Sequence, residues 1–275
     1  MEGLPVELTD LPDEILLLIL KKLDNTKVLY SFIGVNKLVH DSIFTNRLTV
    51  ARCFSDDGPW PQSNNQILDQ FCLQILPTIH HRIEWLNVEP SSLERILLCT
   101  NYPNLCGLGL YNLEKKIALH KTRLIHIFQN QISSLDIEFF RCKKSTLTEN
   151  GNKDIFACIL TVFSKLQYLH FVCCFFIDCL YLLDGRFDQL QRLSVDIDRI
   201  LSPKIIIDNR KQLPNLKRFS LHCKWDTHKY NELIVPLLHR TSDLEELDLH
   251  LVVYSEKRFI DGYDLKYNII NHLLQ

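Results

Sequence analysis

The sequence predicts an α/β fold in which a curved parallel sheet carries helices on its outer side and a small all-α module precedes the sheet. Three observations support this prediction. One six-residue apolar pattern recurs seven times, the segments between its copies have helical periodicity, and residues 8–44 fit neither pattern. The chain has 275 residues, of which 46% are hydrophobic and 23% charged, as is typical of a folded protein with one or two domains.

The recurring pattern has apolar residues at its first, fourth and sixth positions. Its copies begin 22 to 34 residues apart. Because the last two apolar positions alternate with period two, each copy predicts a short strand with one buried face. The seven copies are Ile83/Leu86/Val88, Leu105/Leu108/Leu110, Ile132/Leu135/Ile137, Leu166/Leu169/Phe171, Leu190/Leu193/Val195, Leu216/Phe219/Leu221 and Leu244/Leu247/Leu249.

Apolar residues three or four positions apart precede four of these strands and predict helices. Ser91, Ser92 and Asn152 are suited to start helices, because their side chains accept hydrogen bonds from the free amides of a first turn. A unit of one strand and one helix cannot bury its apolar face alone, so neighbouring units must stack. The helical positions are Ile67, Phe71, Ile75, Leu93, Ile96, Leu97, Ile155, Ile159, Phe163, Leu233, Leu237 and Leu238.

The strand-and-helix unit resembles the leucine-rich repeat in its longer, intracellular form. The resemblance covers residues 64–275 and implies a leucine-rich-repeat solenoid of about seven irregular repeats. The helix before Leu190 is poorly defined, Pro236 falls within the last predicted helix, and Arg141–Asn152 form a polar insert that we expect to be a loop. Residues 264–275 predict one further helix, which either caps the stack or indicates that the sequence is a fragment.

Residues 6–46 predict a separate three-helix module. Its first helix opens at Leu11-Pro12-Asp13-Glu14-Ile15, with Pro in the first turn, acids near the positive end of the helix dipole and Asp10 as the expected N-cap. From Ile15 to Leu23 this helix is apolar nearly all round, which requires burial on every side. A module of this size cannot supply that burial, so either the repeat domain or a separate partner covers the rest.

This module resembles the F-box motif through Leu11-Pro12-Asp13-Glu14-Ile15 and Val35-Asn36-Lys37. In that family the matching surface docks on the Skp-type adaptor of cullin–RING ubiquitin ligases. Leu29, Phe32 and Val35 are expected to hold the small helices together, and Val39 stands where the family often has an aromatic residue, which we expect to weaken docking without abolishing it. The resemblance implies adaptor contacts at Leu11, Pro12, Glu14, Ile15, Leu18, Ile19, Leu23, Phe32 and Val35.

Residues 47–63 are predicted to connect the module to the repeats. Gly58, Pro59 and Pro61 interrupt any helix in this segment. We expect Trp60 to pack against one of its two neighbours.

The outward positions of the repeat strands predict a second surface, since residues beside the buried positions point away from the core. The middle repeats gather aromatic and basic side chains there, and such groups are common interface anchors. We predict that this face accepts an acidic or phosphorylated segment of a target protein, the alternative being an ordinary solvated surface. The predicted target-binding residues are Tyr168, His170, Arg192, Asp196, Arg218 and His222.

The sequence predicts no catalytic residue, metal site, cofactor or small-molecule substrate. Only 8 of 275 residues are Gly, and the single G-x-G at Gly107-Leu108-Gly109 lacks the third Gly of a phosphate-binding loop. The ten cysteines include no C-x-x-C spacing, and no His stands in an H-E-x-x-H context. A net charge of −2 without a basic stripe argues against a dedicated nucleic-acid binder.

The compartment predicted is a reducing one, the cytoplasm or the nucleus. Several cysteines lie in apolar runs, where a reduced Cys packs as a small hydrophobic residue, and no N-x-S/T sequon occurs. Met1–Glu14 lack the basic region of a secretory signal, and Ile15–Leu20 are too short to span a membrane.

These features together predict a substrate-recognition subunit of an SCF-type cullin–RING ubiquitin ligase, which bridges a Skp-type adaptor to a target protein. Other subunits would carry the chemistry, so the chain itself is predicted not to be an enzyme. The alternative is a leucine-rich-repeat scaffold or inhibitor without a role in ubiquitination, in which the first helices only cap the solenoid.

Overall fold

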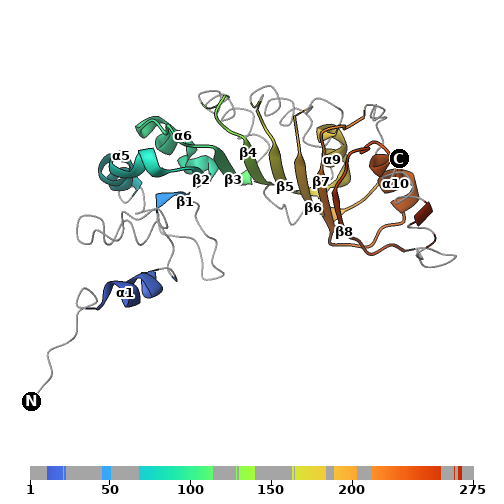
Figure 1. The fold of residues 1–275 in the computed structure, drawn as a ribbon, viewed down its shortest axis with the longest axis horizontal. Coiled ribbons are helices and arrows are strands. Elements are labelled where there is room, and N and C mark those ends of the chain that lie inside the picture. Colours follow the sequence, from blue (N-terminus) through green and yellow to red (C-terminus); the bar gives the residue numbers. More distant parts are fainter. Residues whose placement is uncertain are drawn as a thin grey trace, which may run out of the picture. The chain divides into compact units, whose positions relative to one another are not determined.

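The computed structural model describes residues 11–20, 22, 45–50, 68–113, 128, 130–139, 163, 165–183, 189–202, 212–254, 263 and 266–267. They form two compact units, one up to Gly109 and the other from Leu110 on. The fold is α/β, and its eight strands form one open, all-parallel sheet whose order follows the chain from β1 to β8 (Figure 1).

The first unit contains α1 (Asp13–Leu20), β1 (Arg47–Val50), η3 (Phe71–Ile75), α5 (Leu76–Ile79), η4 (His80–Arg82), β2 (Trp85–Val88) and α6 (Pro90–Cys99). Strand β3 (Gly107–Leu113) contains the boundary between the units. The second unit continues with β4 (Ser134–Phe139), β5 (Tyr168–Phe175), α9 (Phe176–Leu182), β6 (Arg192–Arg199), β7 (Arg218–Cys223), η6 (Tyr230–Ile234), α10 (Val235–Leu238) and β8 (Glu246–His250).

The recurring apolar pattern predicts strands β2 to β8 correctly. The pattern positions of β2 to β7 are at most 3% exposed, whereas those of the last strand, β8, are half-buried. In the second unit the same positions of successive copies are register partners, so each apolar side chain stacks on its counterpart in the next strand. The two aligned rows are Leu135, Leu169, Leu193, Phe219, Leu247 and Ile137, Phe171, Val195, Leu221, Leu249.

Strand β1 lies at the start of the predicted connection 47–63 and is a difference from the sequence prediction. Leu48 is fully buried and is the register partner of Leu86 on β2, and Thr49 Oγ1 accepts a hydrogen bond from the Asn87 side chain at 2.9 Å. The Leu-Thr-Val run suits a strand with one buried face, although it lacks the first apolar position of the recurring pattern. Residues 51–63, with Trp60, lie outside the described residues.

Proline sets the form of the helical segments. Helix α6 begins at Pro90, one residue before the predicted Ser91, because Pro in the first turn loses no hydrogen bond. Pro77 and Pro236 each lie in the first turn of a short α-helix that directly follows a π-helical turn, η3 and η6 respectively. The wider π turn accommodates the missing amide and the bulk of the proline ring.

Helix α9 is the helix before Leu190, which the sequence pattern defines only poorly, and all seven of its residues are buried. It follows β5 directly, so one apolar run covers both elements and periodicity does not separate them. None of the helices in the described part of the chain is both long and apolar enough to cross a membrane. The predictions for Asp10, Leu23, Leu29, Phe32, Val35, Val39, Ile67, Arg141–Asn152, Ile155, Ile159 and nearly all of 264–275 lie outside the described residues.

Candidate protein-binding surfaces

Helix α1 has one buried apolar face and one exposed apolar face. The Pro12 carbonyl accepts hydrogen bonds from the Ile15 and Leu16 amides, each at 3.0 Å, and so fixes the first turn. Leu16 and Leu20, four residues apart, are 1% and 0% exposed. Three other apolar side chains form the opposite face, and their exposed fractions are 45% for Ile15, 61% for Leu18 and 37% for Ile19.

This exposed face of α1, defined by Ile15, Leu18 and Ile19, contains three of the predicted adaptor contacts. The spacing i, i+3, i+4 places the three side chains beside one another on the helix surface. Single exposed apolar residues are ordinary, whereas a contiguous group makes this face a candidate contact surface. Of the remaining adaptor residues, Leu11 is half-buried, Pro12 is exposed and Glu14 lies on α1, while Leu23, Phe32 and Val35 are outside the described residues.

The second surface is the outward side of β5, β6 and β7, where the structure brings all six predicted target-binding residues together. Tyr168, Arg192 and Arg218 are register partners on the three strands. Asp196 and His222 are partners two rows further along, and His170 lies between the two rows on β5. Because partners in a parallel sheet share a face, these side chains form one continuous surface.

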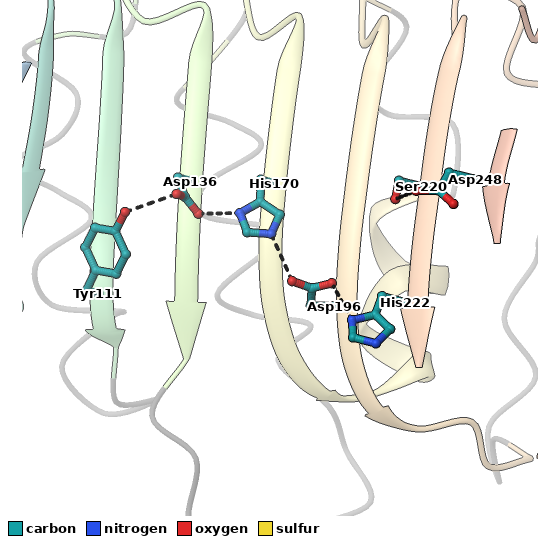
Figure 2. Close-up of polar contacts among 7 residues, drawn as sticks. All are labelled: Tyr111, Asp136, His170, Asp196, Ser220, His222 and Asp248. Carbon is teal, nitrogen blue, oxygen red and sulfur yellow. Dashed lines mark hydrogen bonds and ion pairs between the residues drawn. The ribbon is translucent and has the colours of Figure 1, made fainter. Parts of the chain in front are cut away.

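A chain of polar contacts crosses this surface from β3 to β7, and we call it the polar ladder (Figure 2). It consists of Tyr111, Asp136, His170, Asp196 and His222, one residue from each strand. The Tyr111 hydroxyl donates to Asp136 Oδ2 at 3.1 Å. His170 then links Asp136 Oδ1, 2.8 Å from its Nδ1, to Asp196 Oδ2, 3.4 Å from its Nε2, and His222 Nδ1 lies 3.4 Å from Asp196 Oδ1.

The geometry of the ladder favours the protonated form of His170. Both ring nitrogens face a carboxylate oxygen, and only imidazolium carries a proton on each of them. The hydrogen bond that Asp136 accepts from the His170 ring is the largest cause that raises the pKa of His170, and Asp196 adds to it, while partial burial opposes both. When protonated, His170 is a cation shared by two carboxylates on the neighbouring strands β4 and β6.

We expect the ladder to stabilise the fold more at mildly acidic pH than at alkaline pH. A His whose pKa is raised by folding contributes stability that is fully present below its unfolded pKa, about 6.5, and is lost as pH rises through the folded pKa. The variant Asp136→Asn removes the main cause of the raised pKa. The destabilisation of Asp136→Asn relative to wild type, from urea unfolding across pH 6 to 9, should shrink as pH rises, and the His170 ring resonances should titrate at lower pH in the variant.

Carboxylates on adjacent strands lie beside most of these basic groups, and this pairing was not predicted from the sequence. Arg218 Nε lies 3.2 Å from Glu246 Oε2, and His170 is held by Asp136 and Asp196. Arg192 makes no ion pair within the part of the chain that the structure describes, and its neighbour Tyr168 is 41% exposed. The signal was the presence of an acidic and a basic residue at equivalent positions of neighbouring repeats, as in Asp136/His170, Asp196/His222 and Arg218/Glu246.

Two further contacts extend the surface toward β8. Ser220 donates to Asp248 at 3.3 Å (Figure 2), and the rings of His222 and His250 meet edge-to-face with centroids 4.6 Å apart. Within the described ranges, no three His, Cys, Asp or Glu side chains are grouped so as to hold a metal ion. Comparison of the chain with protein-family models gives no match, and comparison with curated proteins gives none.

Proposed function

We propose that this protein is the substrate-recognition subunit of an SCF-type cullin–RING ubiquitin ligase and works in the cytoplasm or nucleus. The observation that carries the proposal is the exposed face of α1, because Ile15, Leu18 and Ile19 belong to the segment that resembles an F-box. A Skp-type adaptor would cover this face. Leu16 and Leu20 would hold the helix to its own module from the other side.

In this proposal the parallel sheet belongs to a leucine-rich-repeat solenoid, and the outward surface of β5 to β7 holds the target. The register of the apolar rows supports the repeat assignment. The protein would be a bridge rather than a catalyst. Holding the target near the ubiquitin-carrying enzyme raises its effective concentration and lets the other subunits perform the transfer.

The experiment that tests the proposal is a binding measurement between the purified chain and a purified Skp-type adaptor. We expect a one-to-one complex that elutes together in size-exclusion chromatography and then recruits the cullin–RING subunits. An adaptor that binds a known F-box protein in the same buffer but not this chain would contradict the ligase proposal. That result would favour the scaffold or inhibitor alternative.

Among the target-facing residues, Arg192 is expected to matter most for an acidic or phosphorylated target. Its charge is not neutralised within the described residues, whereas Arg218 already pairs with Glu246. The change Arg192→Glu should reduce recovery of bound targets by about tenfold or more. The measurement is quantitative mass spectrometry of proteins captured from cells treated with a proteasome inhibitor.

Lys165→Glu is the matched control, because Lys165 is an exposed cation that precedes β5. Proteins that are lost with Arg192→Glu and retained with Lys165→Glu are candidate targets of the surface. Equal recovery with both variants would contradict a role for Arg192.

A further inference from the structure

Two cysteine thiols and one phenol meet in the first unit, between η3 and the end of α6. Cys72 lies on η3, with its Sγ 4.0 Å from the Arg95 carbonyl oxygen, and Cys99 is the last residue of α6, with its Sγ 3.1 Å from the Ile96 carbonyl oxygen. Both sulfurs therefore lie along the same turn of α6. Cys72 and Cys99 each shift the pKa of the other, and neither Cys is in a disulfide.

A buried phenol lies beside the two thiols. The buried Tyr102 hydroxyl donates to the Ile96 carbonyl at 2.6 Å and lies 3.8 Å from Cys99 Sγ. The three side chains thus gather around two successive carbonyl groups, those of Arg95 and Ile96, on one turn of α6. Cys99 is the more acidic of the two thiols, because the neighbouring Cys72 thiol, followed by the Tyr102 hydroxyl, lowers the pKa of Cys99 to about 7 against the opposing effect of burial.

We propose that Cys72 and Cys99 form a reactive dithiol that hydrogen peroxide oxidises to a reversible disulfide between η3 and α6. The inference does not depend on the ubiquitin-ligase proposal. A dithiol of this kind suits a reducing compartment, where disulfides are transient and report oxidising conditions.

The oxidation proceeds in two steps. The Cys99 thiolate attacks one peroxide oxygen and breaks the O–O bond, which leaves a sulfenic acid on Cys99 and releases hydroxide, which takes up a proton to form water. The Cys72 sulfur then attacks the Cys99 sulfur, forms the S–S bond and displaces the hydroxyl group, which leaves as water with the Cys72 proton. The two thiols lose two electrons and the peroxide gains them.

Cys106 gives the matched comparison within the same unit. It is more exposed than Cys99, but burial of part of its side chain and the nearby Glu84 raise its pKa. Exposure alone therefore predicts that Cys106 reacts first. The lower pKa of Cys99 in its cluster predicts instead that Cys99 reacts first. With iodoacetamide at pH 7, Cys99 should be alkylated at least about fivefold faster than Cys106. This estimate already allows for the lower intrinsic nucleophilicity of a thiolate with a low pKa.

The experiment treats the full chain with hydrogen peroxide, alkylates the remaining thiols and maps the cysteines by mass spectrometry. We expect a Cys72–Cys99 cross-linked peptide pair that is lighter than the two separate peptides by two hydrogen atoms and is restored by dithiothreitol. Cys106→Ser should leave this cross-link unchanged. In Cys72→Ser, the sulfenic acid on Cys99 should persist and be trapped by dimedone.

The proposal would be overturned if wild-type Cys99 oxidised to sulfinic or sulfonic acid without a cross-link to Cys72. It would also fail if Cys106 were alkylated as fast as Cys99. Because Cys72 is buried, Cys72→Ser could impair folding, but the wild-type and Cys106→Ser measurements decide the question without it.

Discussion

Replacing Ile15 and Leu18 together by Asp is expected to abolish binding to a Skp-type adaptor while leaving the protein folded. Both side chains are exposed, at 45% and 61%, so little native packing is lost, and the free energy of unfolding should change by no more than about 1 kcal/mol. In the complex, two carboxylates would replace the centre of the apolar contact. Losses at such positions reach about 2–4 kcal/mol each, which corresponds to an affinity at least about 100-fold weaker.

Leu73→Asp with Leu98→Asp provides the matched control. These two leucines lie in the same unit on η3 and α6 and are 76% and 55% exposed, so the chemical change and the exposure are alike and only the location differs. The control should bind the adaptor like wild type in isothermal titration calorimetry. If the α1 double variant also bound like wild type, the exposed face of α1 would not be the docking surface.

The strands could be predicted from the sequence because the sheet is parallel and repetitive. Each strand buries every second side chain, and the next copy of the pattern places a similar apolar residue beside it, as Leu169, Leu193 and Phe219 do. The alternation of apolar residues within each strand and the spacing of about 27 residues between copies of the pattern therefore both indicate the same stacked strands. Agreement between the two is what makes a short apolar pattern informative.

Features that depend on contacts between strands could not be predicted in the same way. Asp136 is the register partner of His170 on β4, whereas Asp196 reaches His170 diagonally from β6, where the register partner of His170 is the small Ser194. Composition indicated the basic groups but not which carboxylate each of them contacts. Helix α9 was poorly defined in the sequence for a different reason. All of its residues are buried, so it lacks the amphipathic period by which a helix is identified.

The change Leu193→Ala is expected to have the largest effect on stability. Leu193 is fully buried between its register partners Leu169 and Phe219, so truncation leaves a cavity that is closed on both sides by neighbouring strands. Such a substitution costs about 2–5 kcal/mol through lost transfer free energy and the residual cavity. The measurement is the free energy of unfolding from urea denaturation at pH 7.

Leu247→Ala is the matched control, because Leu247 occupies the same row of the sheet and differs in lying on the last strand, β8. It is only half-buried, so its truncation should cost less than half as much as that of Leu193. A difference of this kind means that stability is built up from contacts between neighbouring strands, as in a stacked array. If both substitutions lowered the free energy of unfolding equally, β8 would be covered as completely as β6. The idea that β8 is the less stable end of the stack would then be wrong.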